Sequence, residues 1–332
     1  MSEYRFPYKD AEFIFNHLID FDRFCEEAGL EEVNQELASA ILEEAGRLGT
    51  EVIAPLNEAG DQQGASMGDS GVQESPGFAD AYHQWAESGW ASLTGGEEYG
   101  GQDLPKVIAT AADEVWQSAN MSFSLCPMLT SGAVEALEFH GSDELKEQYL
   151  PKLISGEWTG TMNLTEPQAG SDLAAVTTKA VPEGDHYLVS GQKIFITWGD
   201  HQMTDNIIHL VLARLPDAPP GVKGISLFLV PKFLLDENGN PGERNDVDCV
   251  SIEHKLGIHA SPTCVMSFGD KGGAVGYLVG EPHRGLMAMF TMMNDARQRV
   301  GLQGLSVSER SYQQALVWAK DRLQGTRSDG TR

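Results

Sequence analysis

The segment from Leu164 to Asp172, with the sequence LTEPQAGSD, carries the residues best suited to hold a small polar ligand. It places two hydroxyl groups, those of Thr165 and Ser171, in a turn closed by small residues. Backbone N–H groups and hydroxyls in such a loop can approach a flat polar ligand closely. An ordinary Gly-Ser turn has a similar composition, so the prediction of a binding loop depends on two later segments, residues 191–199 and 255–263.

The bulk composition predicts a globular protein that does not bind nucleic acid. The chain has 332 residues, of which 41% are hydrophobic, enough for two or three domains with a substantial core. Lys and Arg total 23 against 49 Asp and Glu, a net charge of −26 that repels phosphate backbones and anionic membranes. A small anion could still bind where cations gather, and the last segment groups four arginines: Arg297, Arg299, Arg310 and Arg322.

The cysteines and the apolar segments suggest a cytoplasmic protein without metal. The four cysteines are widely separated and show no CxxC and no Cys/His ligand spacing, so neither a zinc site nor a disulfide framework is expected. The first residues show no basic stretch followed by an apolar run, and the longest apolar stretches are too short to span a bilayer. We therefore expect neither secretion nor a membrane span.

The first part of the chain is predicted to be helical. Apolar residues recur at helical spacing from Asp10 to about Leu153. The segment from Gly60 to Pro76 is rich in Gly, Ser, Asp and Gln, which predicts a mobile surface loop. Beyond it, helices are expected near residues 78–88, 107–119, 131–139 and 143–154.

Beyond Gly156 the pattern changes to short runs rich in β-branched and aromatic residues, separated by Gly, Pro and Asp. Closely spaced turn residues, such as Glu183-Gly184-Asp185, favour antiparallel hairpins, and no GxGxxG opens a helix as in a dinucleotide-binding sheet. Strands are expected at residues 159–164, 177–181, 186–190, 193–197, 207–214, 225–231 and 264–268.

From Gly285 to about Leu323 the helical period returns and predicts one long helix. A solitary amphipathic helix of this length is unstable, so it must pack on the first domain or join a bundle whose other helices lie beyond this sequence. The expected fold is α+β: an all-α domain (residues 1–156), a middle antiparallel β domain (157–284) and the start of a C-terminal helical bundle (285–332).

Several short motifs, taken in their order along the chain, resemble those of the acyl-CoA dehydrogenase family of FAD-dependent enzymes. Each motif by itself is short, but their sequence across nearly the whole chain is specific. Besides LTEPQAGSD, they are Gly89-Trp90, EEYGG at 97–101, YLPKLISGE at 149–157, GQKIFIT at 191–197, KLG at 255–257, SPT at 261–263, and Arg297 followed by residues 300–304.

The resemblance implies a flavin site in the β domain. Residues equivalent to Met162, Asn163, Leu164, Thr165, Gly170 and Ser171 lie along the flavin, where Thr165 would donate to the pyrimidine edge instead of capping its own strand. Phe195, Ile196 and Thr197 would lie at the ring, with Phe195 against a face, where many relatives have Trp, and Thr197 near N5. Trp198 is either a further flavin contact or core packing.

The resemblance also places the acyl-CoA ligand and a neighbouring subunit. Ser171 would contact both FAD and the acyl-CoA, and Asn294 and Arg297, one helical turn apart, would meet the CoA portion. The alternative for Arg297 is a solvated surface side chain. Arg322 and Gln324 match an Arg-x-Gln that reaches the FAD of a neighbouring subunit, although Gly325 replaces the usual Phe. A homodimer or homotetramer is therefore expected.

The implied chemistry is α,β-dehydrogenation of an acyl-CoA thioester, with electrons passed to an electron-transfer flavoprotein. A carboxylate must remove an α-proton made acidic by polarisation of the thioester carbonyl. No carboxylate here matches the family's base: one location lies beyond Arg332 and the other holds Ala296. We therefore expect a C-terminally truncated member of the family, inactive over residues 1–332 because it has no catalytic residue of its own.

The start of the chain, Tyr4-Arg5-Phe6-Pro7-Tyr8, and the stretch from Ile258 to Pro262 resemble the larger bacterial branch that includes 3-methylmercaptopropionyl-CoA dehydrogenases. A short thioether acyl-CoA is therefore a plausible substrate. Two alternatives within the superfamily stay open: an acyl-CoA oxidase, in which oxygen reaches the reduced flavin, and a DNA-associated flavoprotein, which the net charge disfavours.

Overall fold

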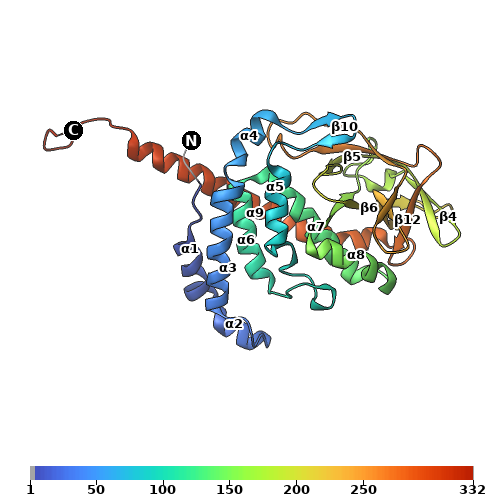
Figure 1. Ribbon diagram of the computed structural model, residues 1–332, viewed down its shortest axis with the longest axis horizontal. Helices are drawn as coiled ribbons and strands as arrows, with labels where there is room; N and C mark the ends of the chain where they lie inside the picture. Colours follow the sequence, from blue (N-terminus) through green and yellow to red (C-terminus); the bar gives the residue numbers. More distant parts are fainter. Residues whose placement is uncertain (1–3, 332) are drawn as a thin grey trace.

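The computed structural model describes residues 4–331 and places helices on both sides of the β segment in sequence (Figure 1). The helical first part agrees with the prediction, but α7 begins ten residues earlier than expected because the Asn120 side chain caps it by accepting from Phe123 N. The α-helices are α1 (Tyr8–Phe13), α2 (Phe21–Ala28), α3 (Gln35–Leu48), α4 (Leu56–Gln63), α5 (Phe78–Glu87), α6 (Lys106–Ala119), α7 (Met121–His140), α8 (Asp143–Ser155) and α9 (Gly285–Asp321).

An eight-stranded sheet forms the middle of the chain, in the order β10-β11-β5-β12-β7-β6-β3, with β4 paired to β5 and β6. Its strands are β3 (Trp158–Asn163), β4 (Lys179–Glu183), β5 (His186–Thr197), β6 (Asn206–Arg214), β7 (Ile225–Pro231), β10 (Val247–Ile252), β11 (Thr263–Phe268) and β12 (Ala274–Val279), and β8 (Phe233–Leu235) pairs with β9 (Pro241–Arg244) outside it. The two strands expected at 186–190 and 193–197 are one continuous strand, β5.

The expected antiparallel pairing holds for most neighbouring strands of this sheet, but β6 has two parallel partners, β3 along its length and β4 at the pair Lys179–Arg214. Strand β3 runs parallel to β6, from Trp158 opposite Asn206 to Asn163 opposite Val211. The turn residues that predicted hairpins lie between β4 and β5 and say nothing about β3, whose partner follows much later in the chain. The parallel pair carries the end of β3 to the side of the sheet where α7 packs.

The expectation of a mobile loop over residues 60–76 was also wrong. The segment completes α4 and then forms a hairpin of β1 (Ser66–Gly68) and β2 (Gly71–Gln73) beside β10 (Figure 1). Its small polar residues do form a turn, but buried Val72 anchors the hairpin in the apolar core of the β sheet. The hairpin therefore joins the helical part to the β part.

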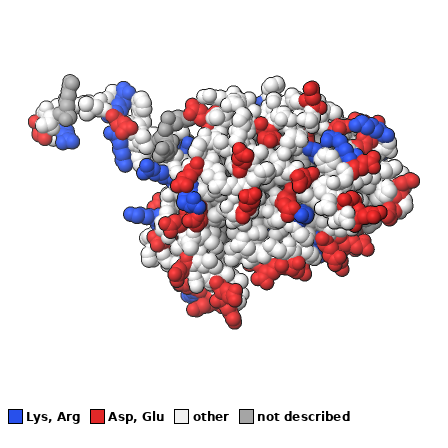
Figure 2. Space-filling model, in the orientation of Figure 1, with Lys and Arg blue, Asp and Glu red and all other residues white. Residues whose placement is uncertain are grey.

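Helix α9 divides into two halves with different surroundings. Its first half packs on α6, α7 and β7, and buries Met289 and Met292. The end of its second half projects from the body, and this half exposes Tyr312 and Trp318 among other apolar residues and carries Arg310 and Lys320 (Figures 1 and 2). Within residues 4–331 no helix combines the length and apolar composition needed to cross a bilayer.

Candidate functional site

The segment from Leu164 to Asp172 leaves the end of β3 as a loop whose hydroxyl residues stay accessible. Thr165 is partly exposed and Ser171 is exposed. The Thr165 hydroxyl has no protein hydrogen-bond partner among residues 4–331, which argues against the capping role considered from sequence. The Thr165 carbonyl accepts a hydrogen bond from Ile194 N at 2.9 Å, so the loop is fixed directly to β5.

A buried ion pair lies beneath this loop. Lys193 Nζ is 2.8 Å from Glu166 Oε1 and also donates to the Leu164 carbonyl at 2.9 Å. Both side chains are buried, at 0% and 2% exposed. The carboxylate of Glu166 further accepts from the backbone N–H and the hydroxyl of both Thr177 and Thr178. Nearly every lone pair of the carboxylate is used, which makes burial of the charge tolerable.

The surroundings of this pair keep both groups charged near neutral pH. Burial opposes ionisation of Glu166, but the Lys193 charge and the threonine hydrogen bonds outweigh it and lower the pKa to about 2. Burial lowers the pKa of Lys193 to about 8, against the attraction of Glu166. A carboxylate with so low a pKa is a poor proton acceptor, so Glu166 supports the loop and is unsuited to be a general base.

Strand β5 carries an irregularity that turns one aromatic ring outward. Its register against β11 shifts between the Ile196–Cys264 and Lys193–Met266 pairs, so β5 has one residue more than β11 there. Phe195, inside this bulge, has a left-handed backbone with φ of 60°. Its side chain is 58% exposed, next to the partly exposed Thr197. A bulky residue in this conformation is strained, and the surrounding bulge must hold it.

Trp198 belongs to the core, which decides between the two interpretations left open from sequence. It is 1% exposed, and its Nε1–H donates to the Ser122 carbonyl at the start of α7. Its backbone N–H donates to the Pro262 carbonyl at 2.8 Å. Trp198 thus links β5 to α7 and to the loop before β11, while Thr197 remains accessible beside it.

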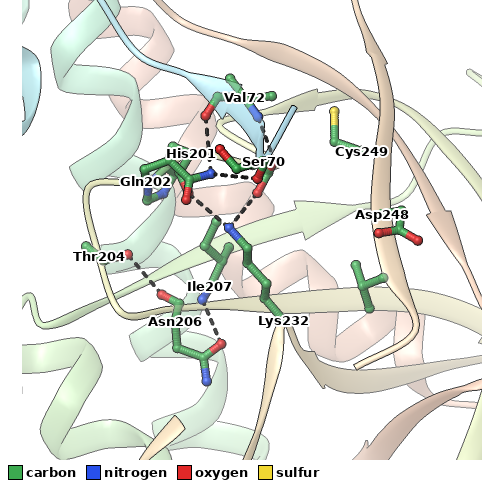
Figure 3. Close-up of polar contacts among 12 residues, drawn as sticks. Ser70, Val72, His201, Gln202, Thr204, Asn206, Ile207, Lys232, Asp248 and Cys249 are labelled. Atoms are coloured by element: carbon green, nitrogen blue, oxygen red, sulfur yellow. Dashed lines mark hydrogen bonds and ion pairs between the residues drawn. The ribbon is translucent and has the colours of Figure 1, made fainter. Parts of the chain in front are cut away.

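A second buried ion pair joins Asp200, which follows Trp198 closely in the chain, to Lys232. Asp200 Oδ1 lies 2.7 Å from Lys232 Nζ, and Oδ2 accepts from Val72 N of the β1–β2 hairpin. Lys232 Nζ also donates to the His201 carbonyl, and the Gln202 side chain reaches two carbonyls of the hairpin (Figure 3). The hairpin is therefore hydrogen-bonded directly to the segment that follows Thr197.

Two histidines lie in the polar interior near β3. Burial, reinforced by Lys232, lowers the pKa of both His201 and His209 to about 3, so both rings are neutral. They bond to Thr159 and Thr161 respectively. No group of three or more His, Cys, Asp or Glu in the described part of the chain is placed to hold a metal ion.

The other predicted flavin-loop residues divide by exposure. Met162 is partly exposed and Gly170 is exposed on the loop. Asn163 is fully buried and bonds to Thr161, and Leu164 and Ile196 are buried in the core. The side chains of these last three residues are therefore not available to a ligand. Alternation along β3 accounts for the difference between Met162 and Asn163, which face opposite sides of the strand.

The predicted residues on α9 lie apart from this loop. Arg297 donates to Asn294 at 2.8 Å, and both are exposed, so they form the pair expected from their spacing. Arg322 stacks on Trp318 at the projecting end of α9, and Gln324 follows it, exposed. The expected cationic group of arginines is not formed, because Arg299 is paired with Asp113 and Asp295 between the helices.

Sequence reasoning named the motif but missed the two residues that hold it in place. Glu166 and Lys193 belong to the motifs LTEPQAGSD and GQKIFIT, which give no sign of their pairing, and Asp200 lies outside both. A lone Lys in an apolar strand is a usable signal, because such a charge must find a buried partner. Nothing local in the sequence pairs Asp200 with a hairpin that precedes it by 128 residues.

Comparison with known families supports the order of elements. The acyl-CoA dehydrogenase N-terminal domain matches residues 34–157, and the acyl-CoA dehydrogenase middle domain matches residues 161–271. A probable acyl-CoA dehydrogenase from Mycobacterium abscessus, of known structure, is 26% identical with a TM-score of 0.69, over 87% of this chain and 70% of that chain.

Two curated relatives cover nearly all of this chain. The 3-methylmercaptopropionyl-CoA dehydrogenase of Ruegeria pomeroyi is 51% identical over 99% of this chain and 55% of its own length. The broad-specificity linear acyl-CoA dehydrogenase FadE5 of Mycobacterium tuberculosis is 36% identical over 98% of this chain and 54% of its own length. The chain thus spans about half the length of these relatives. Together the matched domains and relatives show that the chain belongs to the acyl-CoA dehydrogenase family.

Proposed function

We propose that this protein binds FAD against the Leu164–Asp172 loop and catalyses α,β-dehydrogenation of an acyl-CoA thioester. One observation carries the proposal: the accessible Thr165, Phe195 and Thr197 lie on two segments joined by the hydrogen bond from Ile194 N to the Thr165 carbonyl and fixed by two buried ion pairs. A free hydroxyl, an exposed ring and a second hydroxyl are the groups that a planar ring system with polar edges requires.

The residues present fit an isoalloxazine ring. The Thr165 hydroxyl has no protein partner in the described chain, and the exposed Phe195 ring would gain contact area by stacking on a flat ligand. FAD, when bound, supplies the acceptor for a hydride from the substrate β-carbon. Thr197 would donate toward the atom that becomes electron-rich, and Thr165 would orient the ring.

The rest of the site is assigned by the same proposal. Ser171 would contact the cofactor pyrophosphate and the acyl-CoA, and Asn294 with Arg297 would meet the CoA portion. Met162, Gly170 and the backbones of Asn163, Leu164 and Ile196 would complete the flavin contact, and Arg322 and Gln324 would reach a neighbouring subunit. We assign no α-proton base among residues 4–331, because no carboxylate there matches the family's base; Glu166, which lies beneath the loop, is committed to Lys193.

The relative from Ruegeria supports a short thioether acyl-CoA as substrate, and we propose 3-methylmercaptopropionyl-CoA. We further propose transfer of electrons to an electron-transfer flavoprotein, a homodimer or homotetramer, a cytoplasmic location, and domain boundaries at residues 156 and 284. The exposed apolar residues on the second half of α9 support assembly through that helix.

The test is the absorption spectrum of the purified natural protein before and after addition of acyl-CoA thioesters under anaerobic conditions. We expect flavin absorbance that bleaches with 3-methylmercaptopropionyl-CoA or a similar short thioester. Flavin that stays oxidised with every thioester would refute the reaction, and a folded protein that binds no FAD would refute the site. Stoichiometric peroxide in air would instead identify an oxidase.

A further inference from the structure

A loop outside these cofactor contacts joins β10 to β11 and rests against the C-terminal end of α4. A pocket of about 280 Å³ lies between them, lined from α4 and the residues after it by Asp61 to Ala65, and from the loop by residues 252–255, His259 and Pro262. His259 spans this contact.

The hydrogen bonds of His259 require an imidazolium. Nδ1 is 3.0 Å from the Asp61 carbonyl oxygen and 2.8 Å from Asp61 Oδ1, and Nε2 is 2.9 Å from the Lys255 carbonyl oxygen. Carbonyl and carboxylate oxygens can only accept, so both ring nitrogens must carry a proton to satisfy this geometry. The bonds to the Lys255 and Asp61 carbonyls, with the Asp61 charge, raise the pKa of His259 accordingly.

The loop that His259 fastens is connected to the proposed flavin segment. The His259 carbonyl accepts from Ala65 N, a second bond between the loop and the residues after α4. At the other end of the loop, the Pro262 carbonyl accepts from Trp198 N, and Thr263 pairs with Thr197. A shift of the loop away from α4 would therefore move the backbone partners of Thr197 and Trp198.

We propose that His259, as an imidazolium, is a positioning residue that fastens this loop to α4 and thereby holds Thr197 in place for the flavin, so that loss of its proton loosens the site. The flavin part of this inference rests on the proposed function. The fastening itself rests only on the contacts between His259, Asp61 and Lys255.

The other charged groups around His259 limit what else could titrate there. From α4 comes the carboxylate of Asp61, and the loop contributes Glu253, His254 and Lys255. The Lys255 amine donates to the Ser261 carbonyl at 2.8 Å. His254 is exposed and has no hydrogen bond within the described chain, so its substitution is a matched control for substitution of His259 in the same loop.

The first measurement does not involve flavin. Melting temperatures of the cofactor-free natural protein and of His259→Gln, His259→Arg and His254→Gln are compared between about pH 6 and about pH 8.5. Because the pKa of His259 is raised in the folded state, its stabilisation is present at low pH and lost as pH rises through that pKa. The melting temperature of the natural protein should therefore be higher than that of His259→Gln at pH 6 and equal to it at pH 8.5.

The His259→Arg variant and the His254→Gln control show whether the proton on His259 causes the pH-dependent stabilisation. His259→Arg keeps at least two hydrogen-bond donors and a permanent positive charge. Its melting temperature should therefore be higher than that of His259→Gln at both pH values. His254→Gln should behave as the natural protein. Equal melting temperatures for natural protein and His259→Gln at pH 6 would overturn the fastening, as would a pH dependence that His254→Gln abolishes.

The second measurement is the dissociation constant of FAD, from quenching of flavin fluorescence, on the same proteins. We expect affinity about fivefold weaker at pH 8.5 than at pH 6 in the natural protein, and no such change in His259→Arg. The positioning role would be overturned if the dissociation constant of FAD did not change with pH while the melting temperatures of natural protein and His259→Gln still differed at pH 6 only. If no variant binds FAD at any pH, the proposed flavin site fails and the fastening still stands on its melting data.

Discussion

Lys193 Nζ lies 2.8 Å from Glu166 Oε1, although 27 residues separate the two in the chain. This contact ties the exit of β3 to the middle of β5, and both segments contribute a hydroxyl to the proposed flavin site. The pair itself is too deeply buried to touch a ligand. Its contribution to function is therefore the rigidity of the groups on either side of it.

Replacing Lys193 should destabilise the fold strongly. Lys193→Met leaves the Glu166 charge buried without its cation, which costs about 3–5 kcal/mol. Lys152→Met removes the exposed partner of Glu157 and should cost less than about 1 kcal/mol. Urea unfolding measures both. The double variant Glu166→Gln with Lys193→Met should recover part of the loss, and equal costs for the two single variants would contradict a buried pair.

The acid side of the stability curve should depend on Glu166. Its pKa falls from an ordinary 4.5 to about 2 in the folded protein, so its stabilisation is present above pH 4.5 and is lost as pH falls through 2. We expect the stability advantage of the natural protein over Glu166→Gln to shrink across that interval. The free energy of unfolding, measured at a series of acidic pH values, checks this, and a constant difference would count against it.

Phe195 should matter for the cofactor more than for the fold. Phe195→Ala removes an exposed ring, so we expect FAD affinity to fall about tenfold, from a stacking loss near 1.5 kcal/mol, with little change in melting temperature. Phe139→Ala, another exposed ring on α7, should leave affinity unchanged. Flavin fluorescence titration distinguishes them.

Phe195→Gly gives a sharper version of this experiment. Glycine adopts a φ of 60° without strain, so this variant should be at least as stable as Phe195→Ala and should still bind FAD weakly. Full affinity in Phe195→Gly would mean that the backbone of the bulge, and not the ring, contacts the flavin.

Asp200 should control the β1–β2 hairpin. Asp200→Asn weakens the acceptor of Val72 N and leaves Lys232 without its counter-charge, so amide exchange across Ser66–Gln73 should accelerate at least tenfold. Asp248→Asn, which removes the partly exposed partner of Lys271, should leave this exchange unchanged. Hydrogen exchange followed by mass spectrometry measures the amide exchange rate of the hairpin in both variants.

The sequence predicts a helix or strand well where the spacing of its apolar residues is regular along the whole element. Helix α9 is expected at residues 285–323 and lies at Gly285–Asp321, because its apolar period is a local signal. β5 was expected as two strands, since Ser190-Gly191 looks like a break. Cross-strand pairing with β4 and β11 carries the strand through that point.

The parts that could not be predicted depend on partners distant in sequence. The parallel pairing of β3 with β6 and the docking of Val72 on Asp200 join segments that show no mutual signal in the sequence. The same holds for the site: the accessible Thr165 follows from its motif, but the buried Trp198 and the outward Phe195 follow from a bulge that depends on β11. Tertiary context decided each of these.

The separation of Glu166 from Lys193 has a consequence for biosynthesis. The ribosome releases the loop at Leu164–Asp172 before it has made the strand that supplies the ammonium group, and the parallel partner of β3 emerges later still. A nascent chain halted between these points would carry an acidic turn with no counter-ion and an unpaired strand edge. Translation must therefore pass beyond β6 before this region can acquire its native shape, and chaperone protection would be most useful in that interval.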